Sequence, residues 1–366
     1  GTVVKDSIIM NGAVIGKNCV IEKAIIAENT VIGDGAVLGV GEFAPSEYNP
    51  KVYAFDLVTI GEKSVIPSNV KIGKNTAIFG ETTPEDYPNG ELKSGGMRAI
   101  GIILAGGNSN RMGGLSAKRA VAAMPMAGSY RSIDFSLSNM TNSHIQKVAV
   151  FTQYNSRSLN EHLNSSKWWD FGRKQGGLYV FTPTITTTNS YWYKGTADAL
   201  YQNISFLKNS HEPYVVIASG DGVYKLDYNK VLEEHIATGA DISIVCKEVK
   251  PEEDDISRFG VVDLTADGWV KNFEEKPLVA QSNLASIGVY VIRRRQLIEL
   301  LETCAKEGRS DFVKDILIRY KDVKKIHGYV MDSFWRNIGS VESYYKTNME
   351  FLNKDIRDYF FRTHPD

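Results

Sequence analysis

The stretch IGIILAGGNSNRM, residues 100–112, decides the fold of the larger part of this chain. Its first five residues are apolar, which is typical of a strand buried on both faces of a parallel sheet. The pair Gly106–Gly107 then allows the backbone to approach a phosphate or a nucleobase closely, and Arg111 can hold phosphate oxygens with two parallel hydrogen bonds. The stretch predicts a nucleotide site at the end of a strand, although Gly-Gly turns after strands also occur in proteins without a ligand there.

Length and composition indicate a globular protein with two domains. The 366 residues are enough for two domains, and 43% hydrophobic with 23% charged residues is ordinary for such proteins. The formal net charge of −1 gives no overall attraction to nucleic acid or to an acidic membrane, so we expect neither as a partner. No apolar run reaches the roughly 20 residues that span a bilayer, and no signal peptide is evident. The three cysteines have no CxxC spacing, which favours reduced thiols in a cytoplasmic protein.

Residues 1–80 carry an aliphatic residue at every sixth position. This period predicts a parallel β-helix with three flat sides per coil, in which each coil buries its apolar residues against the next. An irregular insert from Gly39 to Asp56 interrupts the repeat, and we interpret it as a loop that leaves the coil. The positions that share the period are Ile8, Val14, Val20, Ile26, Ile32, Leu38, Ile60, Ile66, Ile72 and Ile78.

The pattern changes after the repeat. Residues 81–96 are polar and rich in Pro and Gly, so we interpret them as a linker or a C-terminal tail. From 97 to 366 apolar runs alternate with helical stretches, which predicts an α/β domain with a mostly parallel sheet and helices on both faces. Ligands in such folds bind beyond the carboxyl ends of the strands. The expected strands are 99–104, 147–152, 214–218, 241–247, 260–264 and 285–292, and the expected helices include 190–209 and 228–239.

Four more clusters could share a crevice with the glycine loop. The segment WYKGTAD at 192–198 places a glycine before a helix, whose N-terminal N–H groups can bind an anion. Asp221 ends the apolar run VVIASGD, where a carboxylate suits Mg²⁺. In FEEKP, Glu275 could bind sugar hydroxyls and Lys276 a sugar phosphate, and SNLAS at 282–286 completes the set.

Each cluster also has a structural interpretation. Glu275 and Lys276 could be a solvated charge pair at a turn, Asp221 could form an Asx turn, and Tyr193 could be a core residue. The order in which these clusters follow the Gly-Gly loop favours the ligand-binding interpretation.

Together these segments resemble bacterial glucose-1-phosphate adenylyltransferase over residues 97–366. The repeat region resembles the left-handed β-helix of the same family, so the resemblance covers nearly the whole chain. It implies a Rossmann-like nucleotidyltransferase domain joined to a left-handed β-helix of hexapeptide repeats. The matching motifs are LAGG at 104–107, SYRSIDFSLSN at 129–139, TQYNSRSLNEHL at 152–163, WYKGTADA at 192–199, SGDGVYKLDY at 219–228, SRFG at 257–260, EEKP at 274–277 and SNLASIGVY at 282–290.

The resemblance implies that ATP and glucose 1-phosphate react to give ADP-glucose and pyrophosphate, a step of glycogen biosynthesis. The protein's part is positioning and charge neutralisation, with Mg²⁺ as cofactor. Arg111 and Asp221 are then the expected catalytic residues, with Asp221 also binding the metal. The expected sugar-phosphate contacts are Tyr193, Gly260, Glu275, Lys276 and Ser286. The expected nucleotide contacts are Leu104, Ala105, Gly106, Gly107, Gln153, Gly195, Thr196 and Ala197.

The chain departs from the family on the reaction side. The third glycine of the family's GGxGxR loop is Ser109, and the family's Lys-Pro pair is Val121-Ala122. Asn337 stands where the family has its second metal carboxylate, and Gly222 stands for a histidine. These losses predict weak Mg²⁺ binding and poor turnover. The pattern resembles the D-type regulatory paralogue, which implies a catalytic paralogue as partner and a homo- or hetero-tetramer.

The family has its catalytic domain first and its β-helix last, whereas here the β-helix comes first, so we interpret the chain as a circularly permuted or spliced polypeptide, or as joined fragments under one numbering. Three other functions stay open. Hexapeptide β-helices also occur in acyltransferases, which typically use a histidine base in the helix. The first histidine here, His144, lies outside the repeat, which argues against acyl transfer. A related nucleotidyltransferase could use another sugar or base, or the chain could be fully active by itself. The sequence predicts no particular allosteric effector.

Overall fold

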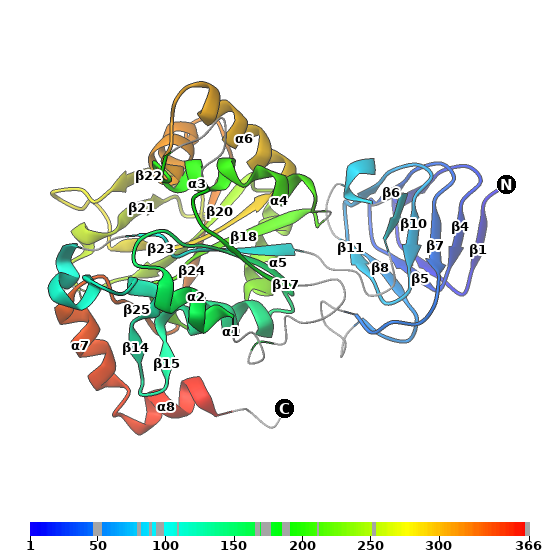
Figure 1. Ribbon diagram of the computed structural model, residues 1–366. Coiled ribbons are helices and arrows are strands. Elements are labelled where there is room, and N and C mark those ends of the chain that lie inside the picture. The colour runs from blue at the N-terminus through cyan, green and yellow to red at the C-terminus, as the bar shows by residue number, and fades with distance from the viewer. Residues whose placement is uncertain are drawn as a thin grey trace. The chain divides into compact units, whose positions relative to one another are not determined.

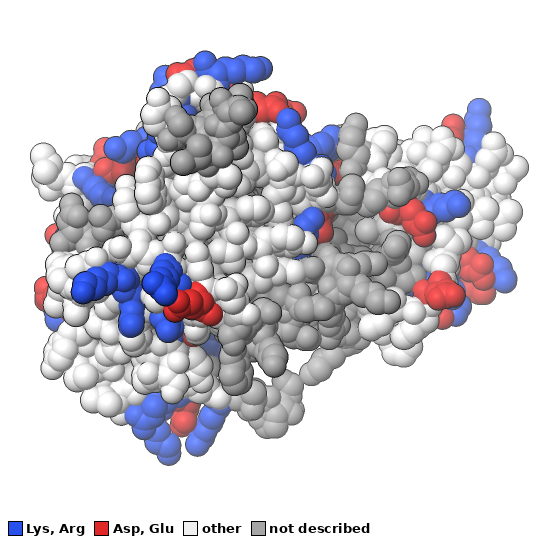
Figure 2. Space-filling view, viewed as in Figure 1, with Lys and Arg blue, Asp and Glu red and all other residues white. Residues whose placement is uncertain are grey.

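The computed structural model describes residues 1–46, 53–78, 82–87, 90–92, 99–107, 110–164, 169, 177–184, 191–210, 212–250 and 254–362. The chain divides into two compact units (Figure 1). The first consists of Gly1–Ile100 with the short segments Phe206–Tyr214 and Ile236–Gly239, and the second consists of the other residues. In the part of the chain that is described, no helix is long and apolar enough to cross a membrane. On the face shown in Figure 2, charged side chains lie in small scattered groups, and most groups of Lys and Arg adjoin Asp or Glu.

The first unit is a three-sided coil of short parallel strands. The chain passes through three sheets in turn, so β1 (Val3–Lys5), β2 (Ile8–Ile9) and β3 (Val14–Ile15) each begin a different stack. The six-residue period predicts this parallel coil. Of the irregular insert, residues 47–52 lie outside the described residues. The strands that continue the stacks are β4 (Val20–Glu22), β5 (Ala24–Ile26), β6 (Val31–Ile32), β7 (Val37–Val40), β8 (Val58–Ile60), β9 (Val65–Ile66), β10 (Lys71–Gly73) and β11 (Ala77–Ile78).

From β4 to β11, each strand places at least one buried aliphatic side chain inside the coil. In the second coil these are Ile21, Ile26 and Ile32, which are all buried. The same positions of the following coils hold Leu38, Ile60 and Ile66, since the strands are stacked in register. Burying an aliphatic side chain of this size stabilises the fold by about 1.5–3 kcal/mol, so the stacked core accounts for the stability of the coil.

The coil continues beyond residue 80 in residues 82–87 and 90–92, part of the segment expected as a linker or tail, whereas residues 93–96 of that segment lie outside the described residues. The strand β12 (Glu91–Leu92) pairs in parallel with β10, with Lys71 opposite Glu91. The backbone N–H and the hydroxyl of Thr82 both donate to the carbonyl of Val65, at 2.9 and 2.8 Å. The Tyr87 ring is buried in the core of the coil. The sequence pattern missed this coil because the six-residue aliphatic period stops at Ile78, and the side chains that continue the core, Tyr87 and Leu92, do not keep it.

The second unit contains a nine-stranded, mostly parallel sheet. The predicted strands are present at nearly the expected bounds. The path of the sheet is β17 (Gly177–Phe181), β16 (Lys147–Phe151), β13 (Ala99–Leu104), β18 (Tyr214–Ser219), β23 (Leu284–Arg293), β20 (Ile242–Glu248) and β24 (Ile326–Met331). Off this path, β21 (Gly260–Leu264) pairs with β23, and β22 (Val270–Glu275) pairs with β21. The strand β13 is parallel to β16, whereas β23 is antiparallel to both β20 and β21.

Helices cover both faces of this sheet: α3, α4 and α6 lie on one side, and α1 and α2 on the other (Figure 1). The helix expected over 190–209 begins only at Thr196 and is interrupted at Asn203, and residue 190 lies outside the described residues. The helices are α1 (Ser132–Asn142), α2 (Arg157–Leu163), α3 (Thr196–Gln202), α4 (Ile204–Lys208), α5 (Tyr228–Thr238), α6 (Arg294–Lys306), α7 (Val341–Glu350) and α8 (Lys354–Phe361).

Candidate active site

The candidate site lies where three neighbouring strands end. The backbone N–H of Ala105, just after β13, donates to the carbonyl of Phe151 on β16 at 2.9 Å. On the other side, the N–H of Gly220 donates to the carbonyl of Leu104 at 3.0 Å. The loops that follow β16, β13 and β18 therefore start side by side. Beyond them lies a cavity of about 540 Å³, within the usual size range of small-molecule sites.

Most of the residues that the sequence singles out line this cavity, although they come from distant parts of the chain. They are Leu104, Gly106, Gly107, Gln153, Tyr193, Gly195, Thr196, Asp221, Glu275 and Lys276. Ala105, Ala197 and Ser286 are buried and do not form part of the cavity wall, and neither do Arg111, Gly260 and Asn337. The structure adds Phe151, Tyr154, Lys194, Ala199, Ser219, Gly288, Tyr290, Asp311, Phe312 and Val313. The segment Asp311–Val313 carries no motif by which the sequence could have indicated it.

Gln153 fixes Tyr193 in place. The Tyr193 backbone N–H donates to Gln153 Oε1 at 2.8 Å, and Gln153 Nε2 donates back to the Tyr193 carbonyl at 3.4 Å. Burial raises the pKa of the Tyr193 phenol above its ordinary value, and the hydrogen bond from Asn203 Nδ2, at 3.0 Å, partly offsets this effect. The phenol is therefore neutral near pH 7 and can donate a hydrogen bond. Both polar atoms of the Gln153 side chain are therefore hydrogen-bonded to the Tyr193 backbone.

The N-terminus of α3 is already occupied by the protein itself. The carbonyl of Ser310 accepts hydrogen bonds from the N–H groups of Ala197, at 2.8 Å, and Asp198, at 3.1 Å. The hydroxyl of Thr196 accepts the N–H of Phe312 at 2.9 Å. This corrects the expectation that the N–H groups of this helix are free to bind an anion. Gly195 is needed because a Cβ there would lie 2.4 Å from the Ser310 carbonyl oxygen.

A short pair of antiparallel strands brings Asp221 and Asn337 to the same place. The strand β19 (Gly222–Tyr224) pairs with β25 (Trp335–Asn337), with Gly222 opposite Asn337. The hydroxyl of Ser219 donates to Asp221 Oδ1, and the N–H of Gly339 donates to Asn337 Oδ1 at 2.9 Å. Asp221 and Asn337, which are more than 100 residues apart in the sequence, therefore lie at the same end of this ladder.

Arg111 reaches the same place from the glycine loop. Its Nη2 lies 3.6 Å from the point that a Cβ on Gly339 would occupy. An arginine beside Gly339 and Asn337 can bind phosphate oxygens there. The remaining residues of the loop, 108 and 109, including the expected substitution at Ser109, lie outside the described residues.

The donor atoms fit a weakly held Mg²⁺. Asp221 contributes one carboxylate, and Asn337 contributes only a neutral amide oxygen. Among the described residues, no cluster of three or more His, Cys, Asp or Glu side chains could hold a metal ion. Mg²⁺ is commonly bound by one or two carboxylates together with substrate phosphates, so these residues suit an ion that arrives with a nucleotide.

The expected sugar side is formed at the edge of the β21–β22 hairpin. Gly260 pairs with Glu275, and a Cβ on Gly260 would lie 2.6 Å from the Phe273 ring. Lys276 Nζ lies 3.1 Å from Glu275 Oε1, and both side chains line the cavity. Glu275 and Lys276 therefore form an ion pair and also face the cavity, although the sequence presented these two interpretations as alternatives. Ser286 lies beneath, where its hydroxyl donates to the Tyr290 hydroxyl at 3.4 Å.

No cation stands at the expected Lys-Pro position. Val121 and Ala122 belong to the short helix η4 (Val121–Ala123), which is buried. The Val121 side chain packs in an apolar cluster with Met112 and Ile338. This position is therefore part of the core that supports the site. A lysine side chain here would have to leave that cluster, because an unpaired buried charge is strongly unfavourable.

Comparison with known proteins places this arrangement in a family. The model of the nucleotidyl transferase family matches residues 100–354. The glucose-1-phosphate adenylyltransferase of Halalkalibacterium halodurans is 41% identical over 259 residues, which are 70% of this chain and 67% of that protein. The chain belongs to the glucose-1-phosphate adenylyltransferase family. The model of the GlmU-like C-terminal hexapeptide family also matches residues 1–47.

Other relatives show how much of the family's length is present. The glucose-1-phosphate adenylyltransferases of Fervidobacterium nodosum and Thermotoga maritima are 41% and 40% identical over 69% of this chain. The chain spans only 61% and 60% of their lengths. A crystal structure described as a putative glucose-1-phosphate thymidylyltransferase from Bacillus anthracis matches with a TM-score of 0.57 and 21% identity, over 70% of this chain and 96% of that chain. At that identity the match supports the fold alone.

Two glycines of the site should respond differently to an added methyl group. Replacing Gly195 by Ala would place the new Cβ 2.4 Å from the Ser310 carbonyl oxygen, whereas nothing lies within 4 Å of a Cβ on Gly107. We expect Gly195→Ala to lower the free energy of unfolding by about 1–3 kcal/mol and Gly107→Ala to change it by less than about 0.5 kcal/mol. Urea denaturation followed by circular dichroism measures both values. Equal stability of the two variants would contradict the close contact between Gly195 and Ser310.

Proposed function

We propose that this chain is a subunit of a glucose-1-phosphate adenylyltransferase that binds ATP and glucose 1-phosphate but turns them over slowly by itself. One observation carries the proposal. The groups suited to a sugar phosphate, Tyr193, Glu275 and Lys276, line one cavity, while the reaction side has Asn337 and a buried Val121 where charged groups are expected. The site thus has the groups that bind the sugar phosphate, but it lacks charged groups that the reaction requires to neutralise phosphate charge.

In this proposal each part of the cavity has a defined task. The Gly106–Gly107 turn leaves room for the triphosphate, because a Cβ on Gly107 would meet no atom within 4 Å. Lys276 binds the phosphate of the sugar, and the neutral phenol of Tyr193 donates a hydrogen bond to the sugar nucleotide. An oxygen of the sugar phosphate attacks the α-phosphorus of ATP, the bond from that phosphorus to the bridging oxygen of the β-phosphate breaks, and pyrophosphate leaves.

The negative charge of the phosphates would be neutralised by Arg111 and by a metal ion held at Asp221. Asp221 would hold Mg²⁺, which when bound neutralises charge on the triphosphate and the leaving pyrophosphate. Arg111 lies near Asn337 and Gly339 and can bind phosphate oxygens there. Because Asn337 contributes no charge, the site has one negative charge fewer than a pair of carboxylates would give, and we infer a lower affinity for the ion.

The partner, on this account, is a catalytic paralogue, and the chain has the part of a D-type regulatory subunit within a tetramer. We also propose that the coil of the first unit winds as a left-handed β-helix. The two domains then stand in the opposite order to that of the family. The three cysteines of the chain are free thiols and are buried, as suits a protein of the reducing cytoplasm. Burial raises the pKa of the Cys246 thiol to about 12, so this thiol is protonated and is no candidate nucleophile.

Release of pyrophosphate from ATP, glucose 1-phosphate and Mg²⁺ tests the proposed division of labour. The chain would be assayed alone and then mixed with an equal amount of a catalytic homologue. We expect little turnover by the chain alone and a rate in the mixture several times that of the homologue. Turnover by the chain alone at the rate of the homologue would contradict the regulatory role.

Substitution of Lys276 tests the sugar-phosphate side. We expect Lys276→Gln to raise the dissociation constant of glucose 1-phosphate about ten-fold, the usual effect of losing one charge-assisted hydrogen bond, and to leave that of ATP nearly unchanged. Titration calorimetry measures both constants without requiring turnover. The matched control is Lys271→Gln, because Lys271 lies on β22, the strand that Lys276 directly follows, and its Nζ also forms an ion pair, at 3.4 Å from Asp263 Oδ2. A similar weakening in both variants would argue against a phosphate contact of Lys276.

A further inference from the structure

The helix α1 buries a row of polar side chains. Ser132, Ser136 and Asn139 follow one another at intervals of four and three residues, so they lie on one face of the helix. All three are buried, and two of them are fully inaccessible. A helix face turned toward a core is usually apolar, because a buried polar group is unfavourable unless it is hydrogen-bonded. The row therefore calls for an explanation beyond packing.

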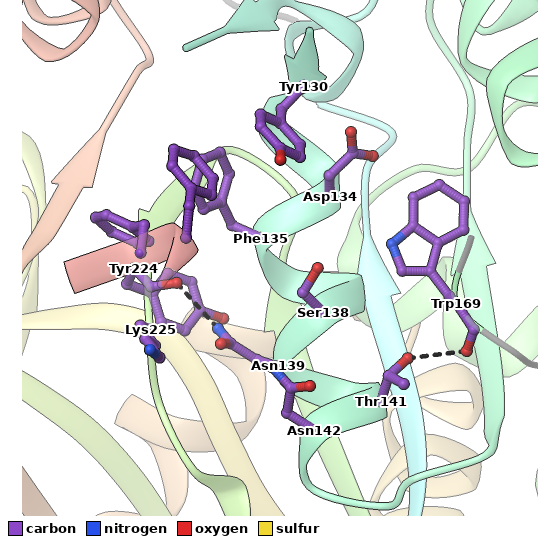
Figure 3. A pocket seen from close by; sticks show the side chains of 12 residues that line it. Tyr130, Asp134, Phe135, Ser138, Asn139, Thr141, Asn142, Trp169, Tyr224 and Lys225 are labelled. Atoms are coloured by element: carbon purple, nitrogen blue, oxygen red, sulfur yellow. Dashed lines mark hydrogen bonds between the residues drawn. The ribbon is translucent and has the colours of Figure 1, made fainter. Parts of the chain in front are cut away.

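Each side chain of the row bonds to the backbone around Asp221. The Ser136 hydroxyl donates to the carbonyl of Ser219 at 2.8 Å, and the Ser132 hydroxyl donates to the carbonyl of Gly220 at 2.9 Å. Asn139 Nδ2 donates to the carbonyl of Tyr224 at 3.1 Å, as Figure 3 shows. The contacts hold the chain on both sides of Asp221, two directly before it and one three residues after it.

These bonds fix the direction of the two peptide groups before Asp221. The carbonyls of Ser219 and Gly220 are turned toward α1, so the metal-binding groups left near the cavity are the Asp221 carboxylate and the hydroxyl of Ser219 that donates to it. The loop is also held from the other side, because the Cβ atoms of Ala105 and Ala122 lie 3.2 Å from the point that a Cβ on Gly220 would occupy. A rotation of either peptide would displace the carboxylate.

We propose that Ser132 and Ser136 are positioning residues that set the place of the Asp221 carboxylate and, through it, the affinity of the site for a divalent cation. Neither hydroxyl lines the cavity, so both act only through the backbone of the loop. The inference rests on the proposed function in one respect, namely that Asp221 is the residue that binds the metal. It extends that function by explaining why polar residues occupy a buried helix face.

The test compares Ser132→Ala, Ser136→Ala and the double variant with the unsubstituted chain. Each substitution removes one hydroxyl and leaves the buried volume nearly unchanged. Binding of Mn²⁺ in the presence of ATP would be followed by electron paramagnetic resonance, since Mn²⁺ takes the oxygen ligands that Mg²⁺ takes. Hydrogen exchange of the backbone amides over residues 219–224 would report the order of the loop.

Ser143→Ala is the matched control. Ser143 lies at the C-terminal end of the same helix and is also buried, and its hydroxyl accepts the N–H of Tyr228 at 2.9 Å. Its removal also deletes one buried hydroxyl of this helix and the hydrogen bond that it makes, without touching Ser219 or Gly220. Binding of ATP without metal is the second control, since a general loss of structure would weaken that binding as well.

We expect the double variant to raise the dissociation constant of Mn²⁺ at least ten-fold and each single variant to raise it about three-fold. Exchange over 219–224 should become faster in the same order, while binding of metal-free ATP stays within two-fold. In Ser143→Ala the Mn²⁺ constant should stay within two-fold. If the double variant does not fold, the single variants carry the comparison.

Equal Mn²⁺ binding by the serine variants and the unsubstituted chain would overturn the inference, whether or not hydrogen exchange becomes faster. An equal loss in Ser143→Ala would overturn it as well, because the effect would then be a general one. Absence of Mn²⁺ binding by the unsubstituted chain with ATP is a different result. It would overturn the proposed metal role of Asp221, and this inference with it.

Discussion

The central constraint on the second unit is the position of β13 between β16 and β18. Backbone hydrogen bonds of 2.9 and 3.0 Å join the last residues of these three strands, so the loops that follow them must start next to one another. Residues about 50 and 115 positions beyond the Gly-Gly turn are brought to it in this way. The helix α1 then holds the third loop through its own side chains. The site is thus an outcome of strand order, and the side chains in it serve a geometry that the sheet sets.

The two sides of the site differ in how they use charge. On the sugar side, Lys276 and Glu275 form an ion pair that faces the cavity, and Tyr193 is held by Gln153. On the metal side, the positions that the resemblance assigns to a lysine and to a second carboxylate hold Val121 and Asn337. Val121 is packed into an apolar cluster, so the valine that stands in place of the expected lysine is part of the core around the site. A neutral group in place of an ion changes the energy of a phosphate complex more than it changes the stability of the fold, and this supports the proposal of a chain that binds its substrates and reacts slowly.

Features that depend on local pattern could be predicted from the sequence. The apolar run before Gly106 predicts the strand β13, and the six-residue repeat predicts the parallel coil. Both are present in the structure. Features that depend on distant contacts could not be predicted. The Ser310 carbonyl occupies the N-terminus of α3 from more than 100 residues away, and no local signal announces it. Likewise, Tyr87 and Leu92 continue the coil although their segment has the composition of a loop, because core packing needs only one apolar side chain at each inward position.

The dependence of pyrophosphate release on Mg²⁺ in Asn337→Asp tests the central claim most directly. The substituted side chain would retain the oxygen that accepts the Gly339 N–H and would add one negative charge beside Asp221. If the metal side is weak for lack of this charge, the Mg²⁺ concentration for half-maximal rate should fall about ten-fold, whatever the maximal rate of the chain. An unchanged Mg²⁺ dependence would contradict the account, because Asn337 would then not belong to the metal site.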